Sequence, residues 1–209
     1  MNETEEIFTR IFDQNSWKGT VKSGPGSALH ITDLIRPALS EAFSDLGIRS
    51  LCDAPCGDGT WVFEVTAGLD RYIGADIVQE LIEDNRRRDL PPGHEFIHRD
   101  VTSDPLPQVD AILCRDCLVH LSLDLAQAAI ENFVRSGAKY LIATTFPTLQ
   151  TNIEARVGTW RPLNLQLAPF GFPEPIRIIR ERAPNPDDKY NDKSLGIWDV
   201  GAIKAVLQG

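Results

Sequence analysis

The 209-residue sequence lacks the features that direct a chain to a membrane or to secretion. No apolar run approaches the roughly 20 residues that a helix needs to cross a bilayer. The first ten residues, MNETEEIFTR, are acidic and polar, which is the opposite of a signal peptide. We therefore expect a cytoplasmic protein with no membrane partner.

Basic charge is also scarce. The chain has 21 Lys and Arg residues against 30 Asp and Glu residues, which gives a net charge of −9. A protein that binds nucleic acid by bulk electrostatics needs a surplus of Lys and Arg to meet the phosphates. A local basic run, NRRRD at 85–89, has acids beside it and is typical of a solvated helix end. The sequence predicts no nucleic-acid partner.

Neither an internal repeat nor a low-complexity tract is present, and the apolar and charged fractions, 42% and 24%, are ordinary for a globular fold. This length suits one domain. We expect a single domain over residues 1–209, in which residues 1–34 form an N-terminal cap or lead-in.

The four cysteines occur as two close pairs, Cys52 with Cys56 and Cys114 with Cys117. Spacings of this kind are found in zinc sites, which remain the alternative interpretation. Each pair, however, follows an apolar strand pattern, where a buried free cysteine behaves as a small hydrophobic residue. We expect no metal and no disulfide, since cytosolic thiols usually stay reduced.

Short apolar runs alternate with helical patterns along the chain, which indicates parallel strands joined by helices. The clearest helix follows Ser122, a good N-cap, and ends before Gly137. The last two strand patterns have no long helix between them, which favours an antiparallel element at the sheet edge. The sequence predicts an α/β fold: one doubly wound, mostly parallel seven-stranded sheet with helices on both faces. The expected strands are 48–54, 71–77, 95–101, 110–116, 138–146, 175–184 and 194–200.

The turn after the first strand reads DAPCGDG, residues 53–59, and precedes a helix expected to start near Thr60. It is neither the G-x-G-x-x-G of dinucleotide-binding folds nor the G-x-x-x-x-G-K-[ST] of phosphate loops. An acid, Asp58, lies between its glycines. Acids here disfavour a pyrophosphate and suit a ligand that carries an ammonium and a sulfonium.

This pattern resembles the first motif of the class I S-adenosylmethionine-dependent methyltransferases, acid-x-G-x-G-x-G, with Pro55 in place of the first glycine. The resemblance implies a Rossmann-like fold, S-adenosylmethionine as cofactor, Asp76 at the ribose and Asp100 at the adenine. The motifs SGPGS, DAPCGD, CRDCLVHL, RPLNL and DKSLG also resemble a bacterial branch of this group. The implied cofactor-binding residues are Asp53, Ala54, Pro55, Gly57, Asp58, Gly59, Asp76, Ile77, Asp100, Val101 and Arg115.

Two of these assignments have structural alternatives. Asp76 has the position and residue type to cap the following helix. Asp100 precedes Thr102, Ser103 and Asp104, which are turn formers.

The segment after the fourth strand, CRDCLVHL, holds the candidate catalytic residues Asp116 and His120. They are four residues apart and would face the same way on a helical turn. Either one is a candidate base for the acceptor's proton. The alternatives are an Arg115–Asp116 pair and a His120 that covers a core edge.

The irregular segment TWRPLNLQLAPFGFPEP is the expected substrate wall, because aromatic residues beside an arginine suit a binding surface. The candidates are Trp160, Arg161 and Asn164, together with Tyr190 and neighbouring Lys193. The alternative is a loop that buries its own aromatic residues.

The resemblance implies methyl transfer to a nitrogen or oxygen of a small-molecule or glycan-like acceptor. Two alternatives remain. One is a module that binds the cofactor without catalysis and acts as a partner or sensor. The other is an NAD-dependent oxidoreductase, which the missing G-x-G-x-x-G disfavours.

Overall fold

The computed structural model describes residues 2–18, 23–183, 185 and 187–208. Its seven strands form one sheet in the order β3-β2-β1-β4-β5-β7-β6. β1 to β5 are parallel, and β7 runs antiparallel to both β5 and β6. The predicted fold class and the antiparallel edge are confirmed. The strands are β1 Ser50–Asp53, β2 Arg71–Asp76, β3 His94–His98, β4 Ala111–Cys114, β5 Tyr140–Thr145, β6 Arg177–Arg180 and β7 Ser194–Asp199.

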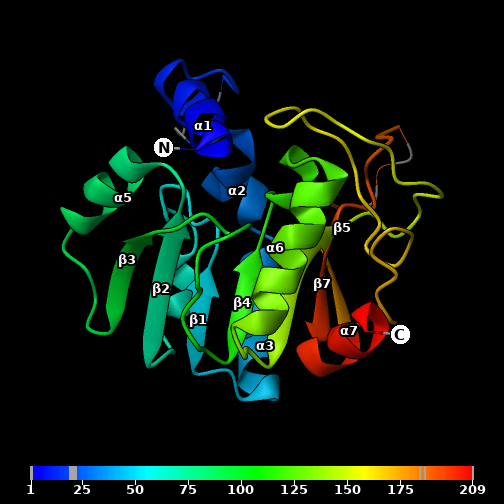
Figure 1. The fold of residues 1–209 in the computed structure, drawn as a ribbon. Helices are drawn as coiled ribbons and strands as arrows, with labels where there is room; N and C mark the ends of the chain where they lie inside the picture. The colour runs from blue at the N-terminus through cyan, green and yellow to red at the C-terminus, as the bar shows by residue number, and fades with distance from the viewer. Residues whose placement is uncertain (1, 19–22, 184, 186, 209) are drawn as a thin grey trace.

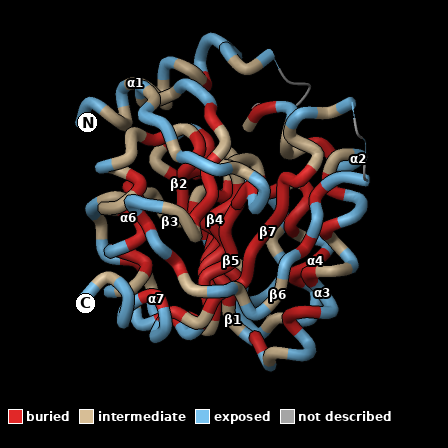
Figure 2. Tube along the Cα trace, turned by 90° about the vertical axis from the view of Figure 1, so that its right-hand side faces the viewer, coloured by how far each residue is buried: buried red, intermediate tan, exposed pale blue. Residues whose placement is uncertain are grey.

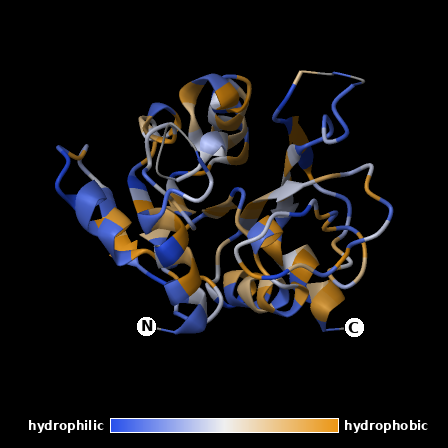
Figure 3. Ribbon diagram, turned by 90° about the horizontal axis from the view of Figure 1, so that it is seen from above, coloured by the Kyte–Doolittle hydropathy of each residue, from blue (hydrophilic) through white to orange (hydrophobic). Residues whose placement is uncertain are grey.

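Helices cover both faces of the sheet (Figure 1). Successive strand residues point to opposite faces, so that Ile142 of β5 packs into one core while Leu141 and Ala143 pack into the other. Figure 2 shows that the strands are buried between the helices on the two faces. Figure 3 shows that the helices carry both hydrophobic and hydrophilic residues. The helices are α1 Glu3–Asp13, η1 Pro25–Ser27, α2 Leu29–Thr32, α3 Ile35–Leu46, α4 Phe63–Thr66, α5 Gln79–Arg86, η2 Leu118–His120, α6 Leu123–Arg135 and α7 Val200–Leu207.

Helix α6 forms as its sequence pattern predicts. The Ser122 hydroxyl accepts a hydrogen bond from the Leu125 amide at 3.3 Å and so satisfies one free N–H of the first turn. Ala126, Ala129, Ile130 and Phe133 are fully buried against the sheet. Gly137, at φ +79°, ends the segment in the left-handed region.

The helix expected to start near Thr60 begins three residues later in the structure, at Phe63. The Asp58 carboxylate accepts a hydrogen bond from the Thr60 amide at 3.0 Å, and Gly59 has φ +64°. These two features favour a turn, and α4 begins only at Phe63. β3 ends at His98, so Asp100 lies in the turn after the strand.

The N-terminal segment crosses the carboxyl edge of the sheet, where α1 and α2 lie above the strands (Figure 1). Asn2 caps α1 by accepting a hydrogen bond from the Glu5 amide at 2.9 Å. Residues 19–22 of the expected cap lie outside the described residues. No helix in the described part of the chain is long and apolar enough to cross a membrane.

Candidate active site

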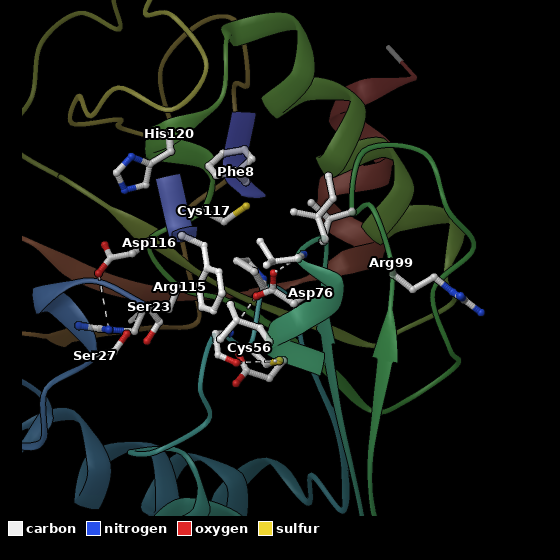
Figure 4. A pocket seen from close by; sticks show the side chains of 18 of the residues that line it. Phe8, Ser23, Ser27, Cys56, Asp76, Arg99, Arg115, Asp116, Cys117 and His120 are labelled. Carbon is white, nitrogen blue, oxygen red and sulfur yellow. Dashed lines mark hydrogen bonds and ion pairs between the residues drawn. The ribbon is translucent and has the colours of Figure 1, made fainter. Parts of the chain in front are cut away.

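A cavity of about 120 Å³ lies at the carboxyl ends of β1, β2 and β4, below α1 (Figure 4). In parallel α/β sheets this edge is where ligands bind. Residues from α1, including Phe8 and Phe12, form an apolar roof. Most of the sequence-predicted cofactor and catalytic residues line this cavity, namely Asp53, Pro55, Gly57, Asp76, Ile77, Asp100, Val101, Arg115, Asp116 and His120.

Gly57 lies at the centre of the loop and has no Cβ, so the loop backbone can lie close to Ser23. Its φ is +54°, and a Cβ placed there would lie 2.6 Å from Cβ of Ser23. Its amide donates a 2.9 Å hydrogen bond to Asp76 Oδ2, and its carbonyl accepts one from Asn85 at 2.8 Å. Asn85 was not expected from the sequence, because its role depends on α5 lying beside the loop.

Asp76 holds the glycine loop and does not cap the following helix. Its Oδ1 accepts a 2.9 Å hydrogen bond from the Val78 amide, while Val78 is itself the N-cap residue of α5 and makes no side-chain cap. Burial raises the pKa of Asp76, and hydrogen bonds from backbone amides oppose that rise. The helix-cap alternative is therefore wrong, and the ribose assignment stays a prediction.

The two acids of the glycine loop, Asp53 and Asp58, do not bring two negative charges to the cavity. Asp53 is buried and accepts a hydrogen bond from the Tyr72 hydroxyl at 3.1 Å. Burial raises the pKa of Asp53 to about 8, so the group is largely protonated at neutral pH. Asp58, Ala54 and Gly59 lie outside the cavity lining. The burial of Asp53 and the place of Asp58 therefore give no support to the expected match between loop acids and a positively charged ligand, and the assignment of both residues to the cofactor stays a prediction.

Asp100 lies at the cavity rim and has partners on both oxygens. Oδ1 accepts hydrogen bonds from the amide and hydroxyl of Thr102, at 2.9 and 2.6 Å. Oδ2 accepts one from Asn2 Nδ2 at 2.8 Å. The turn described by the alternative interpretation is present, and it orients Asp100 toward the N-terminal segment. Its assignment to the adenine stays a prediction.

Asp116 and His120 also line the cavity, on the side away from Cys56 and the glycine loop (Figure 4). Asp116 has φ +54°, an uncommon conformation for a residue with a side chain. Burial alone would raise the pKa of Asp116, but Lys193 and Arg115 outweigh it and hold the pKa far below its usual range. Asp116 Oδ2 is 2.6 Å from Lys193 Nζ, while Oδ1 has no hydrogen-bond partner among the described residues.

His120 ends η2 and packs against Trp17 with the ring centroids 4.8 Å apart. Burial lowers the pKa of His120, although the Asp116 charge opposes that effect. The ring is therefore mostly neutral at neutral pH. Its Nδ1 has no hydrogen-bond partner within the described part of the chain. A neutral imidazole with a free nitrogen is suited to accept a proton.

The five residues expected at the substrate do not line the cavity, namely Trp160, Arg161, Asn164, Tyr190 and Lys193. Trp160 packs edge-on against Tyr190 with the ring centroids 4.8 Å apart, and both rings contact Phe146. The Arg161 guanidinium donates hydrogen bonds to the carbonyls of Ile153 and Leu118. The Asn164 amide donates to those of Pro147 and Leu149.

The contacts of Arg161 and Asn164 secure the irregular segment between β5 and β6. Both side chains are buried and bind backbone carbonyls of the segments around them. The alternative of a loop that buries its own aromatic residues describes Phe170 and Phe172, which are buried, but not Trp160, which is exposed. Contact of these residues with an acceptor stays a prediction.

Sequence reasoning missed Glu181, which joins the site from the end of β6. Its Oε2 lies 2.6 Å from Arg115 Nη2 and 3.2 Å from Lys193 Nζ. Its surroundings in the sequence, RIIRERAP, resemble an ordinary charged edge strand. No local signal distinguishes Glu181 from the exposed residues beside it.

The four cysteines are buried and free. No group of three or more His, Cys, Asp or Glu side chains among the described residues is arranged to hold a metal ion. Cys52 and Cys114 are packed in the core beneath α6, as expected of small hydrophobic side chains.

Residues 51–138 match the family model described as a methyltransferase domain. Among curated proteins, no significant sequence match was found. The matched region contains the glycine loop, Asp76, Asp100, Asp116 and His120. It does not contain the N-terminal segment or the β6–β7 hairpin.

Several solved structures share the fold. Human N-acetylserotonin methyltransferase with S-adenosylmethionine has 15% identity and a TM-score of 0.62, covering 95% of this chain and 60% of that one. Magnesium protoporphyrin IX methyltransferase (ChlM) from Synechocystis PCC 6803 with S-adenosylmethionine has 14% identity and a TM-score of 0.59, covering 94% and 96%. The methyltransferase domain of bacterial CtHen1 has 13% identity and a TM-score of 0.61, covering 82% and 98%.

Together, the domain match and the fold confirm the resemblance to class I methyltransferases. S-adenosylmethionine is the methyl donor of this class of enzyme.

Proposed function

We propose that this class I methyltransferase transfers the methyl group of S-adenosylmethionine to a nitrogen or oxygen of a small-molecule or glycan-like acceptor. The observation that supports this is a single cavity with two different ends. Cys56 of the glycine loop and Asp76 lie on one side of it, and Asp116 and His120 lie on the other (Figure 4). A donor at the first end and an acceptor at the second would meet inside the same cavity.

The loop end fits the cofactor by its shape and by its hydrogen-bonding groups. Gly57 has no Cβ to fill the space beside Ser23. Asp76 accepts hydrogen bonds from the Gly57 amide on Oδ2 and from the Val78 amide on Oδ1, and the Ile77 amide also interacts with the carboxylate. The carboxylate retains capacity to accept a hydrogen bond from a ribose hydroxyl. When bound, S-adenosylmethionine supplies an activated methyl group on a sulfonium. The protein is then required mainly for alignment and for exclusion of water.

At the other end, His120 is the proposed base. Its pKa is lowered by burial, so the ring is able to accept a proton at neutral pH. With the cofactor bound, the acceptor's lone pair would form the bond to the methyl carbon while the methyl–sulfur bond breaks and S-adenosylhomocysteine leaves. The acceptor's proton would pass to Nδ1 of His120. Asp116 is the weaker base, because Lys193 and Arg115 hold its pKa far below neutrality. Its proposed role is to orient the acceptor through Oδ1.

The N-terminal segment has a role in excluding water. Trp17 covers the His120 ring, and Phe8 and Phe12 lie over the cavity. Apolar side chains at this position remove water from the reacting groups and strengthen electrostatic contacts inside the site.

The test is turnover of S-adenosylmethionine to S-adenosylhomocysteine with a panel of amines, alcohols, phenols and glycosides. N-acetylserotonin and magnesium protoporphyrin IX belong in the panel as the acceptors named for two similar structures. Binding of S-adenosylhomocysteine without turnover of any acceptor would favour the non-catalytic module. Thermal stabilisation by NAD, and not by S-adenosylhomocysteine, would favour the oxidoreductase.

A further inference from the structure

A buried cluster of four charges lies beside the proposed acceptor end of the cavity. Arg115 and Asp116 follow β4, while Glu181 and Lys193 flank the loop between β6 and β7. The side chains of Arg115, Glu181 and Lys193 are 4%, 1% and 8% exposed. Such a cluster is stable only when each charge is paired, because desolvation of an unpaired ion costs several kcal/mol.

Each cation of the cluster is paired with carboxylates of the protein. Arg115 Nε and Nη2 donate to Glu181 Oε2 at 3.0 and 2.6 Å, and Nη1 donates to the Gly26 carbonyl at 3.0 Å. Lys193 Nζ lies between Asp116 Oδ2, at 2.6 Å, and Glu181 Oε2, at 3.2 Å. Two positive and two negative charges cancel, so neither cation is left to bind an anionic group.

The remaining capacity at this end is that of a hydrogen-bond acceptor. Asp116 Oδ1 has no partner in the described part of the chain. An ionised carboxylate only accepts hydrogen bonds. The matching group on an acceptor molecule is therefore an N–H or an O–H.

We infer that Glu181 and Lys193 are positioning residues that hold Asp116 and restrict the site to acceptors that present an amine or hydroxyl and carry no negative charge beside the reacting atom. This inference rests on the proposed function. It excludes molecules whose reacting atom adjoins a carboxylate or phosphate. Lys193 acts through Asp116, and Glu181 acts by neutralising Arg115 and Lys193.

The first experiment measures how firmly the cluster holds Asp116. The groups that face this carboxylate are Arg115, Lys193 and His120, with Glu181 behind the two cations. In the wild-type protein, the ¹³C carboxyl resonance of Asp116, assigned with Asp116→Asn, should report an ionised carboxylate at pH values below the usual titration range of aspartate. Lys193→Met should raise its titration midpoint by at least one pH unit, and Lys193→Arg should restore it.

Arg177→Met is the matched control. Arg177 of β6 pairs with Asp45 of α3 at 2.6 Å, so its loss should leave Asp116 unchanged. An Asp116 midpoint that is the same in Lys193→Met and wild type would overturn the positioning role. A merely structural role of Lys193 would lower the melting temperature without moving this midpoint.

The second experiment measures charge preference in the presence of S-adenosylhomocysteine. Ethanolamine and glycolate are matched probes, each with one hydroxyl beside an ammonium or a carboxylate. By thermal shift at millimolar concentration, the wild-type protein should respond to ethanolamine and not to glycolate. Glu181→Gln removes one negative charge, so the ratio of glycolate to ethanolamine affinity should rise at least tenfold. Arg177→Met should keep the wild-type preference.

Equal responses of the wild-type protein to the two probes, including no response to either, would overturn the inference, as would a preference for glycolate. Failure of the proposed function has a different signature. In that case S-adenosylhomocysteine binds and ethanolamine is preferred, but no acceptor in the turnover panel is methylated.

Discussion

Lys193 Nζ lies 2.6 Å from Asp116 Oδ2, although 77 residues separate them in the chain. The exposed pair Arg49 and Asp70 has the same 2.6 Å separation, with side chains that are 62% and 66% exposed. An exposed pair contributes little to stability, because water screens it. The Lys193–Asp116 pair is largely buried, where loss of one partner leaves an uncompensated charge. It connects the antiparallel sheet edge with the proposed reaction site.

The proposed base can be tested with His120→Ala. Turnover should fall by about 10²-fold, which is typical for removal of a general base. The affinity for S-adenosylhomocysteine, measured by calorimetry, should stay near the wild-type value, because His120 lies away from Cys56 and the glycine loop in the cavity (Figure 4). Full activity of this variant on the identified acceptor would place the base elsewhere.

Asp116→Asn tests the charge of the neighbouring carboxylate. Asn tolerates the φ of +54° at this position and keeps the shape of the side chain. We expect a higher KM for the acceptor and lower kcat/KM, with unchanged affinity for S-adenosylhomocysteine. The same kcat/KM as in the wild-type protein would show that the charge does not contribute to acceptor binding.

Asp76→Ala should weaken binding of S-adenosylhomocysteine by about 1.5–3 kcal/mol, the usual range for a charge-assisted hydrogen bond. The change also frees the amides of Gly57 and Val78 that now donate to this carboxylate. Asp58→Ala is the matched control, since Asp58 does not line the cavity. Calorimetry that shows equal losses for both variants would contradict the assignment of Asp76.

Gly57→Ala should lower both stability and cofactor affinity. The left-handed conformation costs a residue with a Cβ about 1–2 kcal/mol, and the new Cβ would lie 2.6 Å from Cβ of Ser23. Adding Ser23→Gly removes the clash but not the backbone strain. We therefore expect the double variant to recover part of the melting temperature, and no recovery would argue against this contact.

Asp53 should make stability depend on pH. Burial raises its pKa in the folded protein from 3.8 to about 8, so the folded state retains a proton that the unfolded state releases. Its contribution is fully present below the unfolded pKa and is lost as pH rises toward 8, by at most about 1.4 kcal/mol per pH unit. Asp53→Asn should remove this slope and become more stable relative to wild type as pH rises. Urea unfolding at several pH values measures the difference, and parallel curves would contradict it.

Features that depend on neighbours in the chain were predictable from the sequence. The α6 helix forms where Ser122 caps a run with helical periodicity, because the first free amides are satisfied within a few residues. The alternation of strands and helices predicted the parallel sheet, and the missing helix between the last two strands predicted the antiparallel edge. The order of Gly57, Asp76 and Asp116 along the chain also placed them at one edge of the sheet.

The partners of the polar side chains were decided only by the tertiary structure. Arg161 and Asn164 were expected at the substrate, yet their side chains bind backbone carbonyls that the fold brings within reach. Glu181 carries no distinguishing pattern in the sequence, and it reaches Arg115 because β7 and β6 lie beside β5 in the sheet. Local periodicity depends on residues a few positions apart. The pairing of buried charges depends on strand order, which brings together residues 66 to 77 positions apart.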